Sequence, residues 1–416
     1  MRASNLGVSA LFVAIGLTAI APAAGMASPV PYRNACLCAG VGGSSASTFL
    51  PSWNEPALPG LRAFPGPLPA VRSKLYVANE LEGSLTVIDA STNQAISRMA
   101  FSYKVPNSPY EMVFTPRGVV VAPDGKTVWV TLPIPQSDCE GGEGLCDGPN
   151  IPPGAMEELV VIDPTADTIL ARISVPSLDG QGVHLSSVVI DKDSRFAYIA
   201  ANGASQIVRV DVQTRALAGR VDLGANRDPQ SIRICDDKLV IANGAGQSLS
   251  VVEIARGTAE EVPLGGVAIQ AVCSADGNSV YATVYDKKEV VRYEFATGAI
   301  THLPLPADAV GPSQLALSAD GKRLYVLDQG TLMGRALSDK MYELDPQTGA
   351  SKATITVGRS PRGLMLSEDG KLAYTANLYD GNISVVDLAT RKVVTSVVTG
   401  TAPFGIGVWQ AGALVQ

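Results

Sequence analysis

Short segments in which apolar and polar residues alternate recur along most of the chain, separated by turns rich in Gly, Asn and Asp. The clearest copies are Lys74–Asn79, followed by Gly83–Asp89, and Leu372–Asn377, followed by Gly381–Asp387. Alternation at every second residue between such turns is typical of β-strands. A further strand that ends in an acidic turn, such as Ala316–Gly321, precedes most copies. The pattern therefore predicts an all-β chain built from a repeated unit of about four short strands.

The repeat returns after about 40 residues, which is the period of a β-propeller blade. The first copy lacks its innermost strand, whereas Ala402–Trp409 follows the last copy and resembles the start of other innermost strands, such as Ser360–Leu366. We therefore expect the C-terminus to supply the missing strand and to close the ring, which removes exposed sheet edges. The prediction is a seven-bladed β-propeller with blade cores at residues 74–100, 117–175, 186–224, 230–264, 270–305, 313–357 and 362–399.

The first residues of the chain predict export. Arg2 gives a positive start, Leu6–Pro22 is an apolar run, and Gly25–Ala27 offers small residues for cleavage, as in a signal peptide. A retained membrane anchor is the alternative, but the apolar run is at the short limit for spanning a bilayer. We expect cleavage and a mature monomer located in the periplasm or outside the cell.

The organisation predicted for the rest of the chain follows from composition. Residues 28–73 are rich in Pro, Gly and Ser without strand periodicity, which predicts an irregular N-terminal arm. No later run is long and apolar enough to span a membrane. The predicted divisions are a signal peptide at 1–27, the arm at 28–73, the propeller at 74–410 and a tail at 411–416.

Charge and cysteine content narrow the classes of function. The net charge is −7, from 32 basic and 39 acidic residues, so the basic footprint of a nucleic-acid-binding protein is missing. Six cysteines fit an oxidising compartment. Cys139 and Cys146 bracket a Gly-rich acidic loop and are predicted to form a local disulfide. Cys235 and Cys273 lie on innermost strands of neighbouring blades, where a bridge is one option and two free buried thiols are the option we favour.

The repeat also carries a family resemblance. Tyr76-Val-Ala-Asn79 and Tyr374-Thr-Ala-Asn377 are each followed by a Gly-led strand that ends in Val-x-Asp. These motifs resemble the YVTN-type propeller family over residues 74–409, although Val240–Asn243 and Tyr281–Val284 depart from the pattern. That family and the related lactonase-like seven-bladed propellers include binding proteins, surface proteins and a few enzymes. The resemblance implies the architecture and export, and it leaves the function open.

The long insertions of the chain are predicted to lie on one face. They are Phe101–Pro116 and Val175–Leu185 between blades, and Pro133–Glu158 and Asp328–Lys340 within blades. In a propeller these two loop types share the face at which the innermost strands begin, while the opposite loops here are short. Elaboration of one face of a rigid scaffold is typical of a binding surface, although insertions can also accumulate wherever they are tolerated.

Side chains at the starts of the innermost strands are expected to ring the mouth of the central channel. Arg117 and Arg362 flank the blade that carries Phe404, while Gln230 and Gln270 are neighbours across the ring. Two guanidiniums beside an aromatic ring suit a carboxylate or phosphate, with the amides orienting a polar ligand. The alternative is that these groups bind only waters and loop carbonyls. The aligned residues are Arg117, Ser186, Gln230, Gln270, Ser313, Arg362 and Phe404.

Two hypotheses for function follow. The first is a non-catalytic scaffold that binds a protein, glycan or small anion on the elaborated face, because no nucleophile elbow, phosphate-binding loop or haem motif is present. The second is a lactonase-like hydrolase in which Arg117 and Arg362 bind substrate and His184 or Glu111 is the general base. We prefer the scaffold and treat an enzymatic role as uncertain.

Two further features have modest interpretations. Asp138, Glu140, Glu143 and Asp147 surround the Cys139–Cys146 loop and could bind Ca²⁺, although their spacing does not match an EF-hand. No other cofactor is predicted. Asn residues recur at the ends of repeated strands, where such side chains cap turns, so we expect a structural role for Asn79, Asn202, Asn243 and Asn377.

Overall fold

A computed structural model describes residues 71–104, 111–133, 156–176 and 183–411 of the 416-residue chain. All of these belong to one compact unit, Leu37–Gln416. The predicted signal peptide, nearly all of the predicted arm and residues 412–416 lie outside the described residues. Within the described part, no helix is long and apolar enough to cross a membrane.

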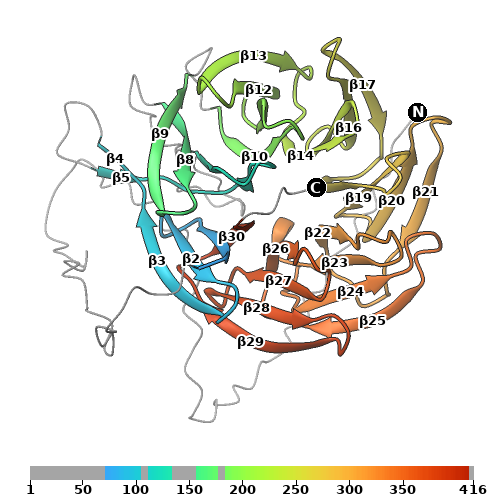
Figure 1. The fold of residues 1–416 in the computed structure, drawn as a ribbon. Coiled ribbons are helices and arrows are strands. Elements are labelled where there is room, and N and C mark those ends of the chain that lie inside the picture. Colours follow the sequence, from blue (N-terminus) through green and yellow to red (C-terminus); the bar gives the residue numbers. More distant parts are fainter. Residues whose placement is uncertain (1–70, 105–110, 134–155, 177–182, 412–416) are drawn as a thin grey trace, which may run out of the picture. The chain divides into compact units, whose positions relative to one another are not determined.

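Seven antiparallel sheets of four strands each are arranged in a ring, which confirms the predicted seven-bladed propeller (Figure 1). Blades 1 to 3 consist of β30 (Pro403–Gln410), β1 (Ser73–Asn79), β2 (Ser84–Asp89) and β3 (Gln94–Ala100); β6 (Val119–Val121), β7 (Val128–Leu132), β8 (Glu157–Asp163) and β9 (Thr168–Val175); and β10 (Leu185–Ile190), β11 (Phe196–Ala201), β12 (Gln206–Asp211) and β13 (Ala216–Asp222).

Blades 4 to 7 repeat this order from the innermost to the outermost strand. They consist of β14 (Pro229–Cys235), β15 (Lys238–Asn243), β16 (Ser248–Glu253) and β17 (Thr258–Pro263); β18 (Ala268–Cys273), β19 (Ser279–Val284), β20 (Glu289–Glu294) and β21 (Ile300–Pro304); β22 (Pro312–Leu317), β23 (Leu324–Asp328), β24 (Lys340–Leu344) and β25 (Ser351–Thr356); and β26 (Pro361–Leu366), β27 (Leu372–Asn377), β28 (Asn382–Asp387) and β29 (Lys392–Val398).

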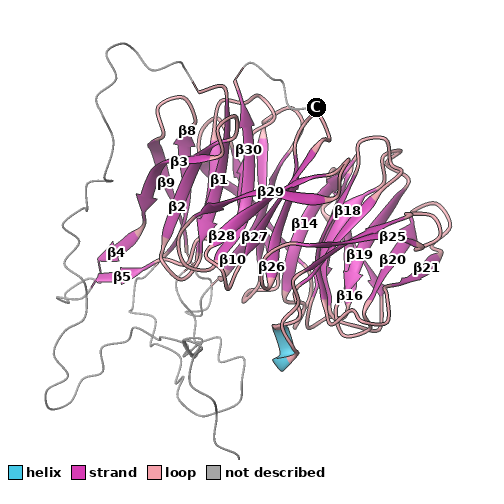
Figure 2. Cartoon of the chain, turned by 90° about the horizontal axis from the view of Figure 1, so that it is seen from below, coloured by secondary structure: helices cyan, strands magenta, loops and turns pink. Residues whose placement is uncertain are grey.

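Two short elements lie outside the blades. The strands β4 (Ser102–Lys104) and β5 (Glu111–Val113) pair with each other and lie outside the ring, beside β3 (Figures 1 and 2). The 3₁₀ helix η1 (Leu332–Gly334) interrupts the connection from β23 to β24 and projects beyond the strand ends in Figure 2.

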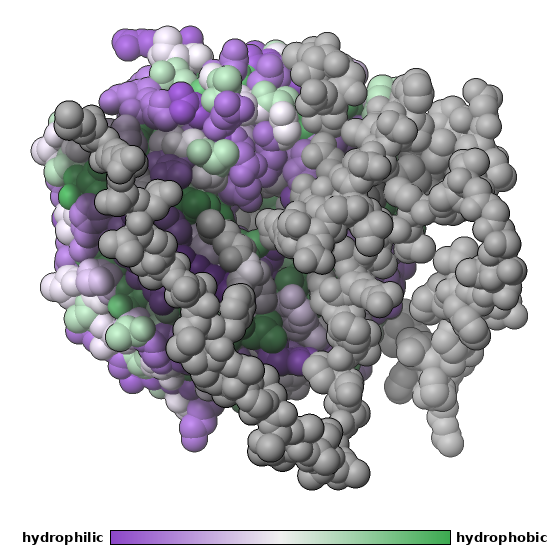
Figure 3. Space-filling view, turned by 180° about the vertical axis from the view of Figure 1, so that it is seen from behind, coloured by the Kyte–Doolittle hydropathy of each residue, from purple (hydrophilic) through white to green (hydrophobic). Residues whose placement is uncertain are grey.

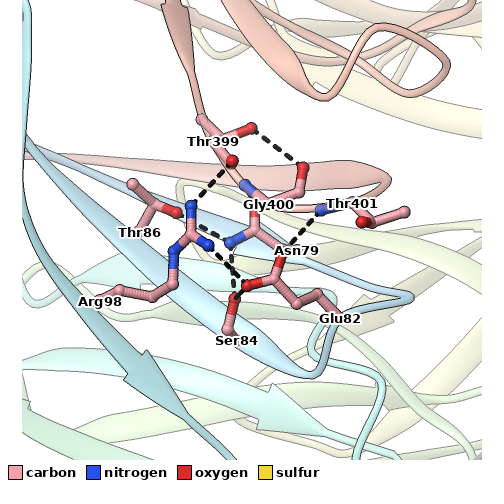
Figure 4. Close-up of polar contacts among 8 residues, drawn as sticks. All are labelled: Asn79, Glu82, Ser84, Thr86, Arg98, Thr399, Gly400 and Thr401. Carbon is pink, nitrogen blue, oxygen red and sulfur yellow. Dashed lines mark hydrogen bonds and ion pairs between the residues drawn. The ribbon is translucent and has the colours of Figure 1, made fainter. Parts of the chain in front are cut away.

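The C-terminal strand closes the ring, as predicted. β30 is antiparallel to β1, with Gly407 opposite Tyr76. The loop before β30 is also held by blade 1, because Asn79 Oδ1 accepts from Gly400 N at 3.0 Å and Glu82 Oε2 accepts from Thr401 N at 2.9 Å (Figure 4). Segments more than 300 residues apart in the chain are thus joined by both strand pairing and side-chain hydrogen bonds.

The core lies between neighbouring blades. The second strands are buried on both faces and the third strands are mostly buried, since sheets pack against both of their sides. The outermost strands alternate between exposed and covered positions, as in β29. Figure 3 shows the result on one face, where polar and apolar residues are interspersed over the surface that the grey atoms leave visible. Exposed and buried residues therefore alternate in outermost strands such as β29, whereas second strands such as β1 and β27 are buried almost throughout.

Glycines that follow the first residues of innermost strands allow adjacent blades to approach closely. A Cβ on Gly363 would lie 2.0 Å from the carbonyl oxygen of Phe404, and one on Gly405 would lie 2.0 Å from that of Arg117. Both contacts are with backbone atoms of the next blade, so no side-chain movement relieves them. The Pro-x-Gly pattern of these strands is thus a packing requirement at the centre of the ring.

Cys235 and Cys273 form a disulfide between β14 and β18, so the prediction of two free thiols is wrong. Each cysteine is the last residue of an innermost strand in neighbouring blades. Because the strands converge at the axis, the two Cα atoms lie 5.6 Å apart, within the range that a disulfide spans. Cys139 and Cys146 lie outside the described residues, and their predicted disulfide stays a prediction.

Three of the four repeated asparagines bridge strands instead of capping their own turns, whereas Asn202 Nδ2 donates to Asp228 Oδ1 of the next blade. Asn79 Nδ2 donates to Ser84 Oγ and Thr86 Oγ1, both at 2.9 Å. Asn243 makes the equivalent pair of bonds in blade 4 and Asn377 does so in blade 7. Each amide thereby ties the end of a second strand to the strand paired with it.

Candidate functional site

Six of the seven innermost strands have a register shift near their start, and in each of these the residue predicted to line the channel mouth (the ring position) lies within the shifted stretch, whereas β6 pairs with β7 without a shift. In blade 7 the pairing register shifts between Pro361 and Gly363, which makes Arg362 the bulged residue. The same shift brackets Gln230 in blade 4. In blade 5 the register pairs Ala268 with Val284 and Ala271 with Ala282, which aligns Ile269 with Arg362. Gln270 therefore lies one residue beyond the position that the sequence alignment gave it.

Arg117, Phe404 and Arg362 lie together, in the order predicted from the blades. The guanidinium carbon of Arg362 is 4.3 Å from the centroid of the Phe404 ring, and that of Arg117 is 5.9 Å away. Both distances are within the range of a cation–π interaction. The aromatic ring thus contacts both cations near the start of β30.

Arg117 is held by two further groups. Its Nε donates to Glu80 Oε1 at 2.7 Å, and its Nη1 lies 2.6 Å from His184 Nε2. The Arg117 and Glu80 side chains retain 14% and 11% of their exposed area, so this ion pair is poorly screened by solvent. Glu80, Arg117 and His184 come from blades 1, 2 and 3, and the cluster therefore depends on the assembled ring.

His184 is positioned by its backbone. Glu157 Oε1 accepts from His184 N and Glu157 Oε2 accepts from Leu185 N, both at 2.7 Å. Glu157 itself is buried in β8 of the preceding blade. His184 also has a φ of 52°, in the left-handed region that non-glycine residues seldom adopt. A buried carboxylate thus fixes an uncommon conformation that directs the imidazole to Arg117.

The environment of His184 favours its neutral form. Burial, and secondarily the nearby charge of Arg117, hold the pKa of His184 well below its usual value of 6.5. A guanidinium has only donors, so Arg117 Nη1 must donate to His184 Nε2. The neutral imidazole then carries its proton on Nδ1 and has its lone pair at Nε2. That nitrogen has the protonation state of a general base at neutral pH.

The side-chain amides of Gln230 and Gln270 make hydrogen bonds to other residues than those of the arginine cluster. Gln230 Nε2 donates to Asp228 Oδ2 at 2.7 Å, and Asp228 also accepts from Asn202 Nδ2. Gln270 is buried, and its Nε2 donates to Gln314 Oε1 at 2.6 Å. The Gln270 amide therefore bonds within the protein across adjacent innermost strands, and Gln230 remains the amide at the ring position.

The other predicted site residues lie either on β5 or outside the described residues. Glu111 is the first residue of β5, outside the ring and beside blade 1 (Figures 1 and 2). Asp138, Glu140, Glu143 and Asp147 lie outside the described residues, so the Ca²⁺ prediction stays a prediction. Among the residues that the structure describes, no group of three or more His, Cys, Asp and Glu side chains could hold a metal ion.

Two residues of the cluster were missed from the sequence. Glu80 directly follows the repeated Asn79, and Glu157 starts β8 at the end of the insertion Pro133–Glu158. Their partners lie 37 and 27 residues away, in other blades. An acidic residue at the end of a strand that is otherwise apolar could have indicated them. A carboxylate that is buried there requires a hydrogen-bonding or charged partner.

Comparisons with known proteins agree with this architecture. Residues 279–406 match a family model described as "Lactonase, 7-bladed beta-propeller". No curated protein matches the chain. The match covers the last blades and ends at β30, so it includes Arg362 and Phe404 but neither Arg117 nor His184.

Solved structures with similar folds come from proteins of different activities. The periplasmic gluconolactonase PpgL of Pseudomonas aeruginosa is 19% identical, with a TM-score of 0.59, over 81% of this chain and 99% of that one. A streptogramin B lyase is 15% identical, with a TM-score of 0.56, over 81% and 95%. Hydrazine synthase of Kuenenia stuttgartiensis is 19% identical, with a TM-score of 0.58, over 76% and 92%. At these identities the likeness concerns the fold alone.

Proposed function

We propose that this protein is an exported, lactonase-like hydrolase that acts where the innermost strands begin, at Arg117, His184, Arg362 and Phe404. The observation that carries the proposal is the 2.6 Å contact between a neutral imidazole and a guanidinium at this position. The family match over residues 279–406 and the fold of a gluconolactonase support hydrolysis over a purely structural role. The non-catalytic scaffold that the sequence favoured thereby becomes the second candidate.

The proposed reaction adds water to the carbonyl carbon of a lactone. His184 Nε2 takes a proton from the attacking water, while Arg117 and Arg362 stabilise the negative charge that develops on the carbonyl oxygen. Collapse of the tetrahedral intermediate breaks the bond between the acyl carbon and the ring oxygen. The imidazolium then returns its proton to that oxygen, and the product is an open-chain hydroxy acid.

Substrate binding would free the base. In the structure the Nε2 lone pair of His184 faces Arg117 Nη1. A substrate oxygen that accepts a hydrogen bond from this guanidinium competes with the imidazole for the same donor. The lone pair of Nε2 then becomes available to a water molecule, while Glu80 continues to hold Arg117 through Nε. Base activation is thus coupled to occupation of the arginine.

The proposal also includes export from the cytoplasm. The Cys235–Cys273 disulfide is consistent with an oxidising compartment, as is the predicted signal peptide at residues 1–27. The YVTN-type resemblance of the strand repeats points to the same location. We place the mature protein in the periplasm or outside the cell.

The test is a hydrolysis screen of the mature protein against aliphatic and sugar lactones, followed by a variant series. His184→Gln keeps an acceptor for Arg117 but removes the base, and it should lower kcat by about 10²-fold or more. Arg117→Gln combined with Arg362→Gln should lower kcat/KM by a similar factor. Arg359→Gln is the matched control. Arg359 lies three residues before Arg362, is exposed, and forms an ion pair with Asp380.

The outcomes separate the two candidates. Loss of turnover in the His184 and double-arginine variants, with Arg359→Gln unaffected, would support the hydrolase. Ligands that raise the melting temperature through Arg117 and Arg362 without turnover would favour the scaffold. Turnover that is unchanged in His184→Gln would exclude this residue as the base.

A further inference from the structure

A second set of equivalent residues lies further along the innermost strands than the ring position, and one member differs from the rest. Each blade contributes one such residue from its innermost strand. This residue is partly exposed or small, and it pairs with a residue of the second strand whose side chain is buried. That buried partner is aromatic in every blade except blade 4. The pairs are Gly407 with Tyr76, Val120 with Trp129, Val189 with Tyr198, Arg233 with Val240, Val272 with Tyr281, Ala316 with Tyr325, and Met365 with Tyr374.

Arg233 is therefore a cation at a level where the other blades present only apolar side chains or glycine. It lies three residues beyond Gln230 on β14. At about 3.3 Å per residue, this corresponds to about 10 Å along the strand. The Arg233 position is thus separate from the Arg117–Phe404–Arg362 cluster at the strand starts.

The guanidinium of Arg233 has little protein compensation. Its Nη1 donates to the carbonyl oxygen of Ile232 at 2.8 Å, within its own strand. Among the described residues, no carboxylate forms an ion pair with it. A guanidinium has five N–H donors, so most of its hydrogen-bonding capacity remains for a ligand or solvent. Its partial exposure shows that solvent reaches the side chain.

The electrostatic setting favours an anion. Burial lowers the pKa of Arg233 to about 10, so the side chain stays charged at neutral pH while being substantially desolvated. The equivalent residues in the flanking blades, Val189 and Val272, provide neither acceptors nor opposite charge. A positive charge that is only partly hydrated and has no counter-charge among the described residues attracts anions more strongly than one in bulk water.

We propose that Arg233 binds a small monovalent anion, chloride or the carboxylate of a small acid, on the axis of the propeller. A single positive charge among apolar side chains matches a single negative charge. A divalent anion such as sulfate would keep an uncompensated charge and would lose more hydration on entry. This site is independent of the hydrolase proposal, since it uses neither His184 nor the two arginines at the ring position.

The test measures melting temperature against anion concentration at constant ionic strength, exchanging sulfate for chloride, bromide or acetate. An anion that binds only the folded protein stabilises it by mass action, so we expect a saturating rise of about 2–4 °C. Arg233→Met, which suits the apolar surroundings, should abolish the rise. Arg362→Gln should retain it, because Arg362 lies at the ring position. Chloride and acetate together should show competition instead of additive effects.

A second measurement covers the case in which Arg233→Met fails to fold. Crystals of the unaltered protein grown in bromide should show anomalous scattering within hydrogen-bonding distance of the Arg233 guanidinium. A melting temperature that does not depend on the anion, together with no bromide at Arg233, would overturn the proposal. A rise that persists in a folded Arg233→Met variant would also overturn it, by assigning the anion to another site.

Discussion

At the residue scale, His184 makes the stability of the folded protein depend on pH. The folded protein keeps this imidazole neutral well below pH 6.5, whereas the unfolded chain takes up a proton as the pH falls through 6.5. Protonation therefore favours the unfolded state in this range, and stability falls as the pH decreases. The limiting slope for one such group is about 1.4 kcal/mol per pH unit.

The corresponding prediction compares two histidine variants. The free energy of unfolding of the unaltered protein should fall between pH 6.5 and 5, and His184→Gln should remove much of that fall. His302→Gln is the comparison variant, since His302 is an exposed residue beside Glu289 and its replacement controls for the loss of an imidazole as such. Denaturant titrations at several pH values measure both. An equal slope in the His184 variant would show that other groups cause the dependence.

A second residue-scale prediction concerns blade spacing. Gly363→Ala should lower the free energy of unfolding by about 1–3 kcal/mol, because the new Cβ would lie 2.0 Å from the Phe404 carbonyl oxygen. Gly298→Ala is a comparison in which nothing lies within 4 Å of the new Cβ, so only its φ of 70° adds a cost. The new Cβ should displace the backbone of Phe404. A decrease of hydrolysis in Gly363→Ala would show that this displacement alters the site. Equal stability of Gly363→Ala and the unaltered protein would contradict the close packing.

At the element scale, the disulfide joins two innermost strands whose cysteines are 38 residues apart in sequence. The chain-entropy account gives about 4 kcal/mol for a loop of this length. Cys235→Ala combined with Cys273→Ala should therefore lower the free energy of unfolding by about 2–4 kcal/mol. Reductant should destabilise the unaltered protein by more than it does the double variant. Identical responses to reductant would place the stabilising disulfide elsewhere.

The sequence predicted blades well because each strand is marked by local alternation and by a turn. The ring position in blade 5 was assigned less accurately. Other innermost strands begin with a proline, such as Pro361 or Pro403, and this strand begins with Ala268. Without that proline, Gln270 was placed one residue too early. Free thiols were favoured over the Cys235–Cys273 disulfide because placing both cysteines on neighbouring innermost strands does not fix the distance between their Cα atoms. Glu157 was missed because its partners lie in the next blade.

At the scale of the whole molecule, ring closure depends on contacts between the two ends of the propeller. Asn79→Ala removes two donations within blade 1 and also the acceptor of Gly400 N (Figure 4). Asn243→Ala removes the equivalent donations in blade 4. We expect Asn79→Ala to cost about 1 kcal/mol more, since it also leaves a buried backbone donor unpaired. Equal losses in denaturant titrations would contradict a special role for the closing loop.

The assembled ring also explains the site. Glu80, Arg117 and His184 belong to three different blades, and Arg362 and Phe404 come from the seventh and first. The cluster exists only when the ring is closed, so a variant that opens the ring should lose hydrolysis before it loses its strands. Loss of turnover in parallel with the far-ultraviolet circular dichroism signal would contradict this order.

The most direct test of the account is the pH dependence of kcat/KM for a lactone, measured with the unaltered protein and with His184→Gln. The account predicts hydrolysis that decreases only at pH values well below 6.5, where His184 becomes protonated, and a loss of about 10²-fold or more in the variant. Absence of hydrolysis with every lactone tested, or equal activity of the variant across the pH range, would contradict it.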